Sequence, residues 1–563
     1  MRNRLSFIPL TCLVVFSLAG CSTTTTESVK SDDPFQAAEE KLTPLASPCT
    51  FVASTGLMTV TVAAGETAII SRRAADSAIL QNGQSCDNLA TNGTLKKLIV
   101  NGTGTGKTAI LDFTNGLFAT GTSSTATTGI AVDLGTGGGN TLGIRGTTGA
   151  DNIAYGLTGV NLNNDAFKDI TVANVATHIV YLGDGADTFT AGGQAAVGAA
   201  FGSALTVYGG AGADTFVQSA LSTPSETIYG GADVDTVTYT ARTAAVTVTV
   251  SAAATVSADD GVTGENDDIK SDVEIVTGGT LADTMTAATG VPVTFNGGPG
   301  DDTLTGDTGA DTLNGEAGND TLIGKDGNDI LNGGDGDDTF DEETTTNGGD
   351  TFNGGAGIDT VDYSGRLLSG VTVTMDGTVA NDGFASEADN VKADVENCIG
   401  TAQIDNITGN ALGNTITGGL GADILSGGAG DDTFDEGALT SGADTISGGT
   451  GVDTVDYSAR GTFVTVVLDG TTPSGQASEG DLLATDMENV LGTSGNDVIT
   501  GNANANELVG GAGDDHLNGL GGDDTLEGGG AAESNVLDCG PGDGDIGFGK
   551  GTGASAAMTN CEF

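Results

Sequence analysis

Apolar and polar positions alternate with a period of nine residues in the middle of the chain. Between Gly297 and Asp341 the sequence reads GGPGDDTLT, GDTGADTLN, GEAGNDTLI, GKDGNDILN and GGDGDDTFD without a gap. Each segment begins with Gly, has Asp at its sixth position and places a large apolar side chain at its eighth. Gly permits the positive φ values of a tight turn, and the Thr-Leu or Ile-Leu pair suits a short strand. The pattern therefore predicts one turn and one strand per segment.

Two such segments close a flattened coil of 18 residues, so every second segment stacks at the strand spacing of about 4.8 Å. The sixth-position Asp side chains then stack as well. Adjacent carboxylates repel by about 1 kcal/mol in a water-like dielectric and by about 3–4 kcal/mol at an effective dielectric of 20. We therefore expect a cation between the turns. Carboxylate and Gly-loop carbonyl oxygens form a hard, multidentate cage that suits Ca²⁺ better than Mg²⁺.

Two further blocks repeat the pattern less strictly. Gly400 to Asp435 reads GTAQIDNIT, GNALGNTIT, GGLGADILS and GGAGDDTFD, and Gly492 to Glu527 reads GTSGNDVIT, GNANANELV, GGAGDDHLN and GLGGDDTLE. Asn replaces Asp at two sixth positions, and because an amide oxygen brings no charge we expect weaker sites there. The alternative, a flexible low-complexity linker, is disfavoured because a linker has no reason to keep an apolar residue at every eighth position.

These segments resemble the RTX, or haemolysin-type calcium-binding, nonapeptide GGxGxDxUx, in which U is a large apolar residue. The resemblance implies an all-β fold, a right-handed parallel β-roll or β-solenoid that is disordered without calcium. It also implies that Ca²⁺ ions bridge a turn to the second turn after it through the sixth-position Asp and loop carbonyls. Carried onto this chain, the metal ligands are Asp302, Asp311, Asp320, Asp329, Asp338, Asp405, Asp423, Asp432, Asp497, Asp515 and Asp524. The Asn positions are Asn414, paired with Asp432, and Asn506, paired with Asp524.

The chain also contains a longer internal duplication. GGxGxDTF units open at Gly209, Gly333 and Gly427, and a second unit ending Asp-Thr-Val opens 21 residues after each. A Tyr and an Arg follow in every case, at Tyr239 and Arg242, Tyr363 and Arg366, and Tyr457 and Arg460. An alternating strand such as VTVTV and an acidic stretch come next. We infer three related modules, each a roll interrupted by a longer β excursion. The Tyr and Arg form either a binding surface or, as we favour, an aromatic cover and an ion pair where the ladder breaks.

Residues 43–205 have no strict period. They are rich in Thr and Gly, with strand-like runs such as LMTVTV and LKKLIV between turn signals. We expect an irregular β-rich domain, either a solenoid or a sandwich, that caps the roll. The segment from Asn101 to Thr108, NGTGTGKT, is similar to a phosphate-binding loop, but it lacks the first Gly and precedes a strand-like AILDF rather than a helix. Nucleotide binding is therefore excluded.

The N-terminus carries an export signal. Arg2 and Arg4 precede a short apolar core, and Leu-Ala-Gly-Cys ending at Cys21 resembles the bacterial lipobox, in which the Cys is acylated and becomes the first residue. The apolar run is too short to span a bilayer; the alternative is an ordinary signal peptide with an incidental Cys. Ser22 after the Cys resembles lipoproteins sorted to the outer membrane. We expect an exported protein that is lipid-anchored to the cell envelope, at the outer membrane or cell surface.

Cysteine positions agree with an oxidising compartment. Cys49 and Cys86 bracket the first folded segment, and Cys539 and Cys561 bracket the last, so both pairs are expected as disulfides, although sequence alone leaves the connectivity open. Cys398 takes the place of a Val in the parallel segment and is expected to be a buried apolar side chain.

Composition restricts the partners. The chain of 563 residues has 94 Gly, no Trp, 76 acidic and 18 basic residues, and a net charge of −58. Nucleic acid is excluded because phosphate contacts need clusters of Lys and Arg. Such charge alone would favour disorder, yet apolar residues make up 37% of the chain and recur at regular intervals. The charge is better explained as a series of cation sites.

No catalytic motif is present. The two histidines are His178 and His516, and neither an HExxH zinc motif nor a GxSxG elbow occurs. The sequence favours a non-enzymatic, calcium-binding, surface-anchored protein with a structural or adhesive role. Its partners are Ca²⁺, the membrane through the lipid anchor, and a glycan or cell-surface ligand. The alternative is a calcium-dependent extracellular enzyme of the polysaccharide lyase, epimerase or hydrolase type. A groove in residues 43–205 lined by converging Asp, Arg, Lys or Tyr would favour that alternative.

The predicted division of the chain has seven parts. They are a signal peptide (1–20), a flexible tether (21–42), the irregular β-rich domain (43–205), a degenerate roll module (206–296), two roll modules (297–399 and 400–491), and a roll with a disulfide-tied C-terminal cap (492–563).

Overall fold

The computed structural model describes most of the chain from Asp33 onward. The described residues are 33–36, 45, 49–75, 77–87, 90–91, 94–116, 129–156, 159–162, 168–192, 204–220, 225–252, 260–288, 290–344, 347–378, 380–385, 387–529, 534–542, 544–549 and 557–561. All of their named secondary-structure elements are β-strands, and only the single residue Gln36 has a helical assignment. Within these ranges, no helix has the length and apolar character needed to cross a membrane. The signal peptide and Cys21 lie outside the described residues, as does most of the tether.

The strands form five sheets, of which the two largest contain 16 and 15 strands. In spatial order the 16-stranded sheet comprises β1 (Thr50–Val52), β2 (Leu57–Val62), β6 (Lys97–Gly102), β8 (Gly129–Asp133), β12 (Ile170–Ala173), β11 (Gly159–Asn161), β10 (Asn152–Gly156), β14 (Thr188–Ala191), β16 (Thr215–Gln218), β18 (Thr236–Thr238), β22 (Ile275–Thr277), β24 (Thr294–Pro299), β26 (Thr312–Ala317), β28 (Ile330–Asp335), β30 (Thr351–Ala356) and β33 (Asn390–Val391). The 15-stranded sheet comprises β20 (Gly261–Val262), β19 (Val246–Val250), β23 (Thr284–Ala287), β25 (Thr303–Thr305), β27 (Thr321–Ile323), β29 (Thr339–Asp341), β31 (Thr360–Asp362), β34 (Asn397–Ile399), β36 (Thr415–Thr417), β38 (Thr433–Asp435), β40 (Thr454–Asp456), β43 (Asn489–Leu491), β45 (Glu507–Val509), β47 (Thr525–Gly529) and β49 (Ile546–Gly549).

Three smaller sheets complete the fold. A nine-stranded sheet comprises β21 (Asp268–Ile269), β17 (Glu226–Ala232), β15 (Leu205–Ala211), β13 (Thr177–Asp184), β9 (Thr141–Arg145), β7 (Thr108–Asp112), β3 (Thr67–Arg72), β4 (Ile79–Gln81) and β5 (Gln84–Ser85). One five-stranded sheet comprises β32 (Thr372–Thr374), β35 (Asn406–Thr408), β37 (Ile424–Ala429), β39 (Thr445–Thr450) and β42 (Leu482–Leu483). The other comprises β41 (Thr465–Val467), β44 (Val498–Thr500), β46 (His516–Asn518), β48 (Val536–Asp538) and β50 (Ala557–Thr559).

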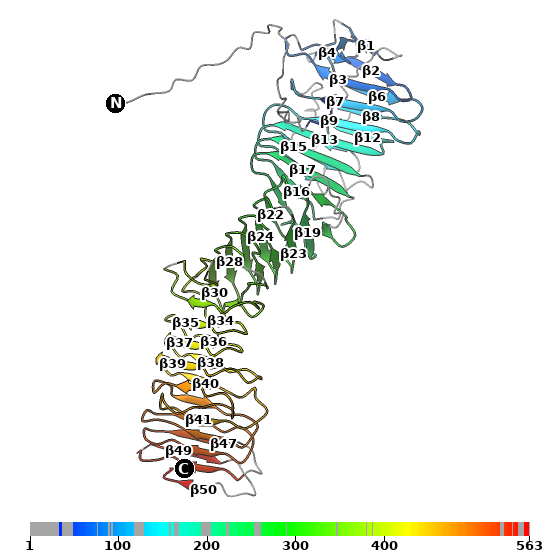
Figure 1. The fold of residues 1–563 in the computed structure, drawn as a ribbon. Coiled ribbons are helices and arrows are strands. Elements are labelled where there is room, and N and C mark those ends of the chain that lie inside the picture. The colour runs from blue at the N-terminus through cyan, green and yellow to red at the C-terminus, as the bar shows by residue number, and fades with distance from the viewer. Residues whose placement is uncertain are drawn as a thin grey trace, which may run out of the picture.

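Figure 1 shows these sheets as one elongated stack of coils that is wide near the N-terminal end and narrow toward the C-terminal end. Most neighbouring strands pair in parallel, and the register gives the length of each coil. Paired residues are 40 apart between β2 and β6, 27 apart between β13 and β15, and 21 apart between β15 and β17. From β24 to β26 the separation is 18. The predicted 18-residue coil of a parallel roll is therefore confirmed; its handedness stays a prediction.

The core changes along the stack in the same way. In the wide coils a strand such as β2 buries three side chains, Met58, Val60 and Val62. In the narrow coils a three-residue strand buries only its central residue, which is the apolar eighth position of the nonapeptide, as Leu304 and Leu322 illustrate. One apolar side chain per nine residues supplies little of the free energy needed to order them.

The described strands between residues 50 and 205 are part of the solenoid rather than of a sandwich. The 16-stranded and nine-stranded sheets both continue through residue 205 in parallel register. The segment that is similar to a phosphate-binding loop is the turn between β6 and β7, so no helix follows it. The proposed boundaries between modules stay predictions.

The cysteines lie as expected. Cys49 is bonded to Cys86 and Cys539 to Cys561, so both predicted disulfides are present. Cys398 is a free thiol and is fully buried on β34. His516, at the start of β46, lies exposed on the outer face of its strand.

Candidate metal centre

A ladder of acidic side chains runs along the turns of the roll, and most strands of the roll directly follow one of them. The backbone N–H of Asp302 donates to Oδ1 of Asp320 at 2.7 Å, and the N–H of Asp320 donates to Oδ1 of Asp338 at 2.8 Å. The pairs Asp311 with Asp329, Asp405 with Asp423, and Asp497 with Asp515 show the same bond. The structure thus brings together the carboxylates that the sequence paired at a separation of 18 residues. The N–H bond fixes one oxygen of each carboxylate and directs the other into the turn.

The second carboxylate oxygen is the distinctive feature of these turns. Among the described residues, Oδ2 is buried without a hydrogen-bond partner in Asp302, Asp320, Asp329, Asp338, Asp423, Asp432 and Asp524. A β-carbon built on Gly315 would collide with Oδ2 of Asp320 and with the carbonyl oxygen of Gly333 in the next turn. Those two oxygens therefore face the same small space. Buried oxygens that face one another without a donor are unfavourable unless a cation lies between them.

Two kinds of turn differ in the backbone φ angle of the residue four positions before the Asp. Gly298, before Asp302, has a φ of 103°, and in this kind of turn Oδ2 stays open. Two side-chain-bearing residues adopt the same conformation, Glu316 at 77° and Lys325 at 66°, and Oδ2 is again open. A non-Gly residue at positive φ is strained. This unusual conformation therefore accompanies each open oxygen in these three turns.

In the other kind of turn the chain satisfies its own carboxylate. Oδ2 of Asp311 accepts the Asp307 N–H at 2.9 Å, Oδ2 of Asp405 accepts Thr401 N–H at 2.7 Å, and Oδ2 of Asp497 accepts Thr493 N–H at 2.6 Å. These three predicted ligands stay predictions, and the geometry favours them less than the open turns.

The two Asn turns show what replaces the carboxylate. Asn414 accepts the Asn410 N–H with Oδ1 and donates from Nδ2 to the Glu396 carbonyl oxygen at 2.8 Å. Asn506 makes the equivalent bonds, including one from Nδ2 to the Glu488 carbonyl oxygen at 2.8 Å. The amide bridges two turns with its own hydrogen atoms. This supplies a physical reason for the weaker sites that the sequence predicts there.

Several ladder residues were missed by the sequence analysis. Oδ2 is buried and has no hydrogen-bond partner in the described part of the chain in Asp187, Asp214, Asp235, Asp350, Asp359, Asp453 and Asp545. All but the last precede Thr-Phe or Thr-Val. An Asp followed by Thr-Phe or Thr-Val is therefore the sequence signal for these positions, and Asp214, Asp235, Asp359 and Asp453 carry it within the duplicated units. The spacing of 21 residues between the duplicated units breaks the nine-residue period, so the nonapeptide pattern alone does not predict these positions as ligands.

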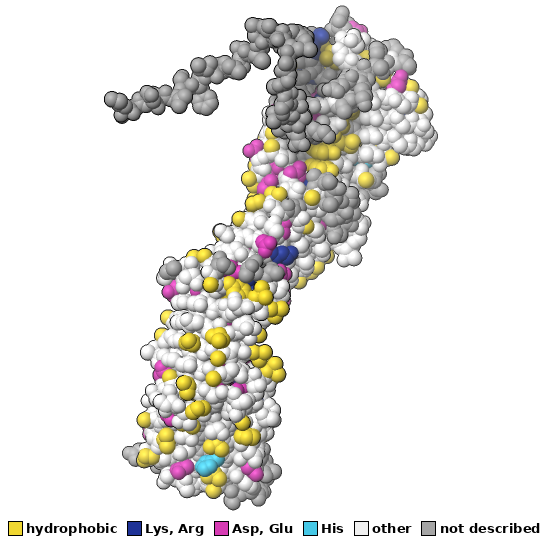
Figure 2. All heavy atoms as spheres, viewed as in Figure 1, with side chains coloured by type: hydrophobic (Ala, Val, Ile, Leu, Met, Phe, Trp, Pro, Cys, Tyr) yellow, Lys and Arg dark blue, Asp and Glu magenta, His cyan; other side chains and the backbone are white. Residues whose placement is uncertain are grey.

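The ladder contains an excess of buried negative charge. More than thirty acidic side chains of the described residues are buried, against six of Lys and Arg. Accordingly, few Asp and Glu side chains are visible on the face of the roll in Figure 2. Burial, reinforced by neighbouring carboxylates, raises the pKa of Asp302, Asp329 and Asp423 to about 7, although a backbone N–H bond to each opposes the shift. Without metal, these groups hold protons close to neutral pH.

The repeated Tyr and Arg residues are interior, not a surface. Arg366 pairs with Glu342 and, at 2.8 Å, with Glu387, and its side chain is fully buried. Tyr363 is also fully buried, and its hydroxyl donates to Asp389 at 3.3 Å. The favoured explanation, an aromatic cover with an ion pair where the ladder breaks, is confirmed in this module and in the two related ones.

Comparison with known proteins agrees with this geometry. A family model of the RTX calcium-binding nonapeptide repeat, four copies long, matches residues 294–322, 315–341, 399–435, 439–459, 486–516 and 500–532. No curated protein matches the chain. The match at 439–459 includes Asp444 and Asp453, which are not among the ligands predicted from the sequence. The narrow coils therefore contain RTX calcium-binding nonapeptide repeats, which imply that this part of the chain binds Ca²⁺.

Proposed function

We propose that this protein is an exported, envelope-anchored structural or adhesive protein whose roll is ordered by Ca²⁺ ions held between stacked turns. The observation that carries the proposal is the repeated, buried Oδ2 that faces the Gly carbonyl oxygen of the next turn, as in Asp320 and Gly333. When bound there, Ca²⁺ would supply the positive charge that the described turns do not provide. Hard oxygen ligands and a flexible cage are the preference of this ion.

The setting of the roll supports a role outside the cell. Extracellular calcium modules have dissociation constants of about 10⁻⁴–10⁻³ M, so the roll would order on export and not before. Two disulfides fit an oxidising compartment. The lipid anchor at Cys21 rests on the lipobox sequence alone. An anchored stack of coils would act as a spacer or as a contact surface for a glycan or another cell-surface ligand.

The enzymatic alternative requires a substrate-binding hollow in the N-terminal part of the solenoid. A hollow of about 180 Å³ is lined by Asp33, Arg145, Tyr181 and Asp184, together with the turn at 146–148. Sites for small molecules usually occupy about 300–1,000 Å³. Arg145 already pairs with Asp33 at 2.7 Å and with Asp112 at 3.4 Å, so it serves as a structural ion pair. These observations support the non-enzymatic proposal.

Circular dichroism of the full chain tests calcium-dependent folding. We expect the strand signal to fall in calcium-free buffer and to return at millimolar Ca²⁺, but not at the same concentration of Mg²⁺. An unchanged spectrum would show that the roll does not depend on the ion. Anchoring is tested separately by fractionation of cells that produce the full chain: Cys21→Ala should release the protein from the membrane fraction, and retention there would contradict the lipid anchor.

A further inference from the structure

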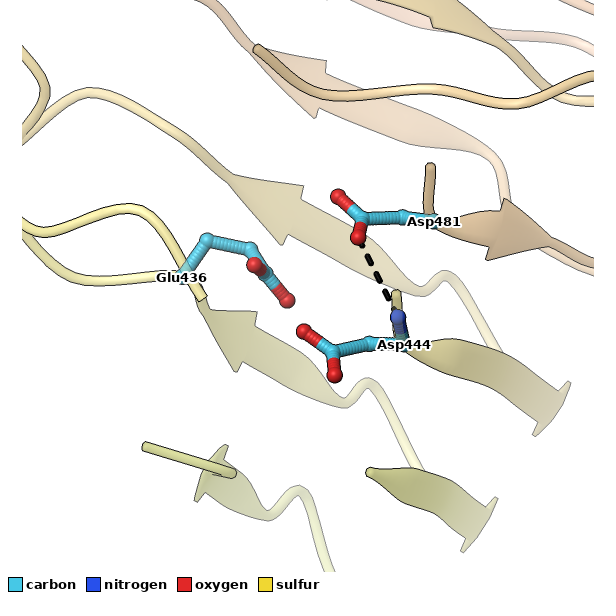
Figure 3. A group of neighbouring side chains, drawn as sticks. All are labelled: Glu436, Asp444 and Asp481. Carbon is cyan, nitrogen blue, oxygen red and sulfur yellow. Dashed lines mark hydrogen bonds between the residues drawn. The ribbon is translucent and has the colours of Figure 1, made fainter. Parts of the chain in front are cut away.

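A group of three carboxylates lies where the third module leaves the regular roll. Glu436 follows β38, Asp444 precedes β39 and Asp481 precedes β42, and one carboxylate oxygen from each lies within 4.8 Å of the others. In Figure 3 the side chains of Glu436 and Asp444 point toward one another, and Asp481 accepts the Asp444 N–H at 3.2 Å. The three residues are 8%, 2% and 0% exposed. They form a buried, all-oxygen cluster.

The surroundings leave this cluster strongly negative. Arg460 contacts Glu436 at 3.0 Å and also pairs with Glu479, which is buried as well. Tyr457 donates from its hydroxyl to Oδ2 of Asp481 at 2.9 Å. One guanidinium thus faces four carboxylates in a water-poor site. Such an excess of buried charge is costly unless cations or protons compensate it.

The second module has residues of the same kind at the equivalent positions of the chain. Glu342, Asp350 and Asp389 occupy the positions of Glu436, Asp444 and Asp481, with Arg366 and Tyr363 in the same roles. Here Glu342 and Asp350 are 1% and 0% exposed, and Oε1 of the former and Oδ2 of the latter have no hydrogen-bond partner among the described residues. Each of these two carboxylates therefore has one buried oxygen without the hydrogen-bond donor that such an atom needs.

The first module supplies a natural variant of the cluster. Gln218 stands where the other modules have Glu342 and Glu436, and it donates to Glu226 at 3.1 Å. Asp267 holds the place of Asp389 and Asp481. Because the module is folded in the same way with Gln, a Glu-to-Gln change at this position is compatible with the fold.

We propose that Glu436, Asp444 and Asp481 form a calcium site of a second kind. The ligand set is hard and anionic, which suits Ca²⁺. The site differs from the turn sites because Glu436 and Asp481 lie outside the nonapeptide motif, and Asp481 arrives only after a long excursion. Paired residues of β39 and β42 are 37 apart, against 18 between β35 and β37. The ion would connect Asp481, at the end of the excursion, to Glu436 and Asp444 in the coil from which the excursion starts. The inference goes beyond the proposed function, because it requires no ion in the turns.

Terbium luminescence of the full chain tests the site. The chain has no Trp, so near-ultraviolet excitation sensitises Tb³⁺ through Tyr, and Tyr457 contacts a ligand of the site directly. We expect Glu436→Gln to remove the Tyr457-dependent part of the sensitised emission and to weaken Ca²⁺ competition for that part by about tenfold or more, since the ligand charge count sets affinity. Tyr457→Phe should lower the sensitised emission while directly excited emission stays constant. Glu507→Gln, an exposed position on β45, is the control for charge.

The outcomes separate this site from the turn sites. If Glu436→Gln keeps the wild-type circular dichroism but leaves both the Tb³⁺ and the Ca²⁺ titrations unchanged, the proposal is wrong and protons compensate the cluster. If Glu436→Gln fails to fold, Tyr457→Phe decides: an unchanged sensitised emission overturns the proposal and a decrease supports it. The strand content measured by circular dichroism could also be the same with and without calcium, while Glu436→Gln still removes its part of the Tb³⁺ emission. That result would support this site and would contradict calcium-ordered folding of the turns.

Discussion

The wide coils between β2 and β13 and the narrow coils between β24 and β31 stack their strands in the same way, but they bridge their turns with different chemistry. In the wide part, Asn140 is buried and its Nδ2 donates to carbonyl oxygens of Leu134 at 3.3 Å, Gly135 at 3.2 Å and Asn174 at 2.9 Å. Lys107 is likewise buried, and its Nζ donates to the Gly104 carbonyl oxygen. The chain itself places positive hydrogen atoms among the turn oxygens.

The open turns of the narrow coils place only oxygens there. Oδ2 of Asp320 and the carbonyl of Gly333 face one another with no donor between them. A strand of the narrow part also buries one core side chain where β2 buries three. The comparison indicates that the wide part carries its stability within the chain, whereas the narrow part obtains a share of its stability from bound ions.

The largest expected effect is regional unfolding on calcium removal. An ion present at ten times its dissociation constant stabilises the folded state by about 1.4 kcal/mol, so three such sites acting together contribute about 4 kcal/mol. In calcium-free buffer, hydrogen exchange measured by mass spectrometry should therefore accelerate about a thousandfold or more in peptides from 294–362 and 397–527. Peptides from 57–72 and 97–112, held by a larger core and by the Cys49–Cys86 disulfide, should stay protected. Equal loss of protection in both regions would contradict the comparison.

An intermediate effect is expected from pH in calcium-free buffer. Burial raises the pKa of Asp302 and Asp329 to about 7, well above their usual 3.8. Because the folded roll then binds protons more tightly than the unfolded chain, its stability falls as pH rises from about 4 to about 7. The metal-free roll should be more ordered at pH 5 than at pH 8, as judged by its urea unfolding midpoint.

Calcium should reverse this trend, because ions and protons compete for the same oxygens, so calcium affinity increases over the same pH window. The wide coils are the internal control. A metal-free roll that gains stability from pH 5 to pH 8 would show that the ladder carboxylates are already compensated within the chain.

The features set by local period could be predicted from the sequence. The coil of 18 residues, the stacking of Asp302 on Asp320 and the buried eighth position all follow from a repeat in which each residue has the same neighbours in every turn. The coils of residues 43–205 could not be predicted in this way. Their length changes from 40 residues to 27, so the sequence has no constant period there.

Two properties of the sites depend on more than the motif. In the turns of Asp302, Asp320 and Asp329 the open oxygen accompanies a positive φ four residues before the Asp, and neither Glu316 nor Lys325 predicts a positive φ by its residue type. The cluster of Glu436, Asp444 and Asp481 depends on an excursion that returns to the coil, which no repeat encodes. The local sequence pattern therefore predicted most ladder residues, whereas only the structure distinguishes open turns from turns in which the chain satisfies its own carboxylate.

The smallest expected effect, and the one that divides the two regions most sharply, is a reversal of sign at Asp320. With calcium present, Asp320→Asn should destabilise the roll by roughly 1–2 kcal/mol, a typical cost for one substitution, because it removes a charge from the cage. In calcium-free buffer at pH 8 the same change should stabilise the roll. It removes a buried carboxylate whose pKa burial raises to about 6, and it supplies an amide that can bridge turns as Asn414 does. Asp326→Asn makes the same change of charge at an exposed position and should have little effect in either buffer. Urea unfolding in both buffers measures the difference. Destabilisation of equal size in both would mean that Asp320 serves the fold only as an acceptor for the Asp302 N–H, and the narrow coils would then be bridged, like the wide ones, by the chain alone.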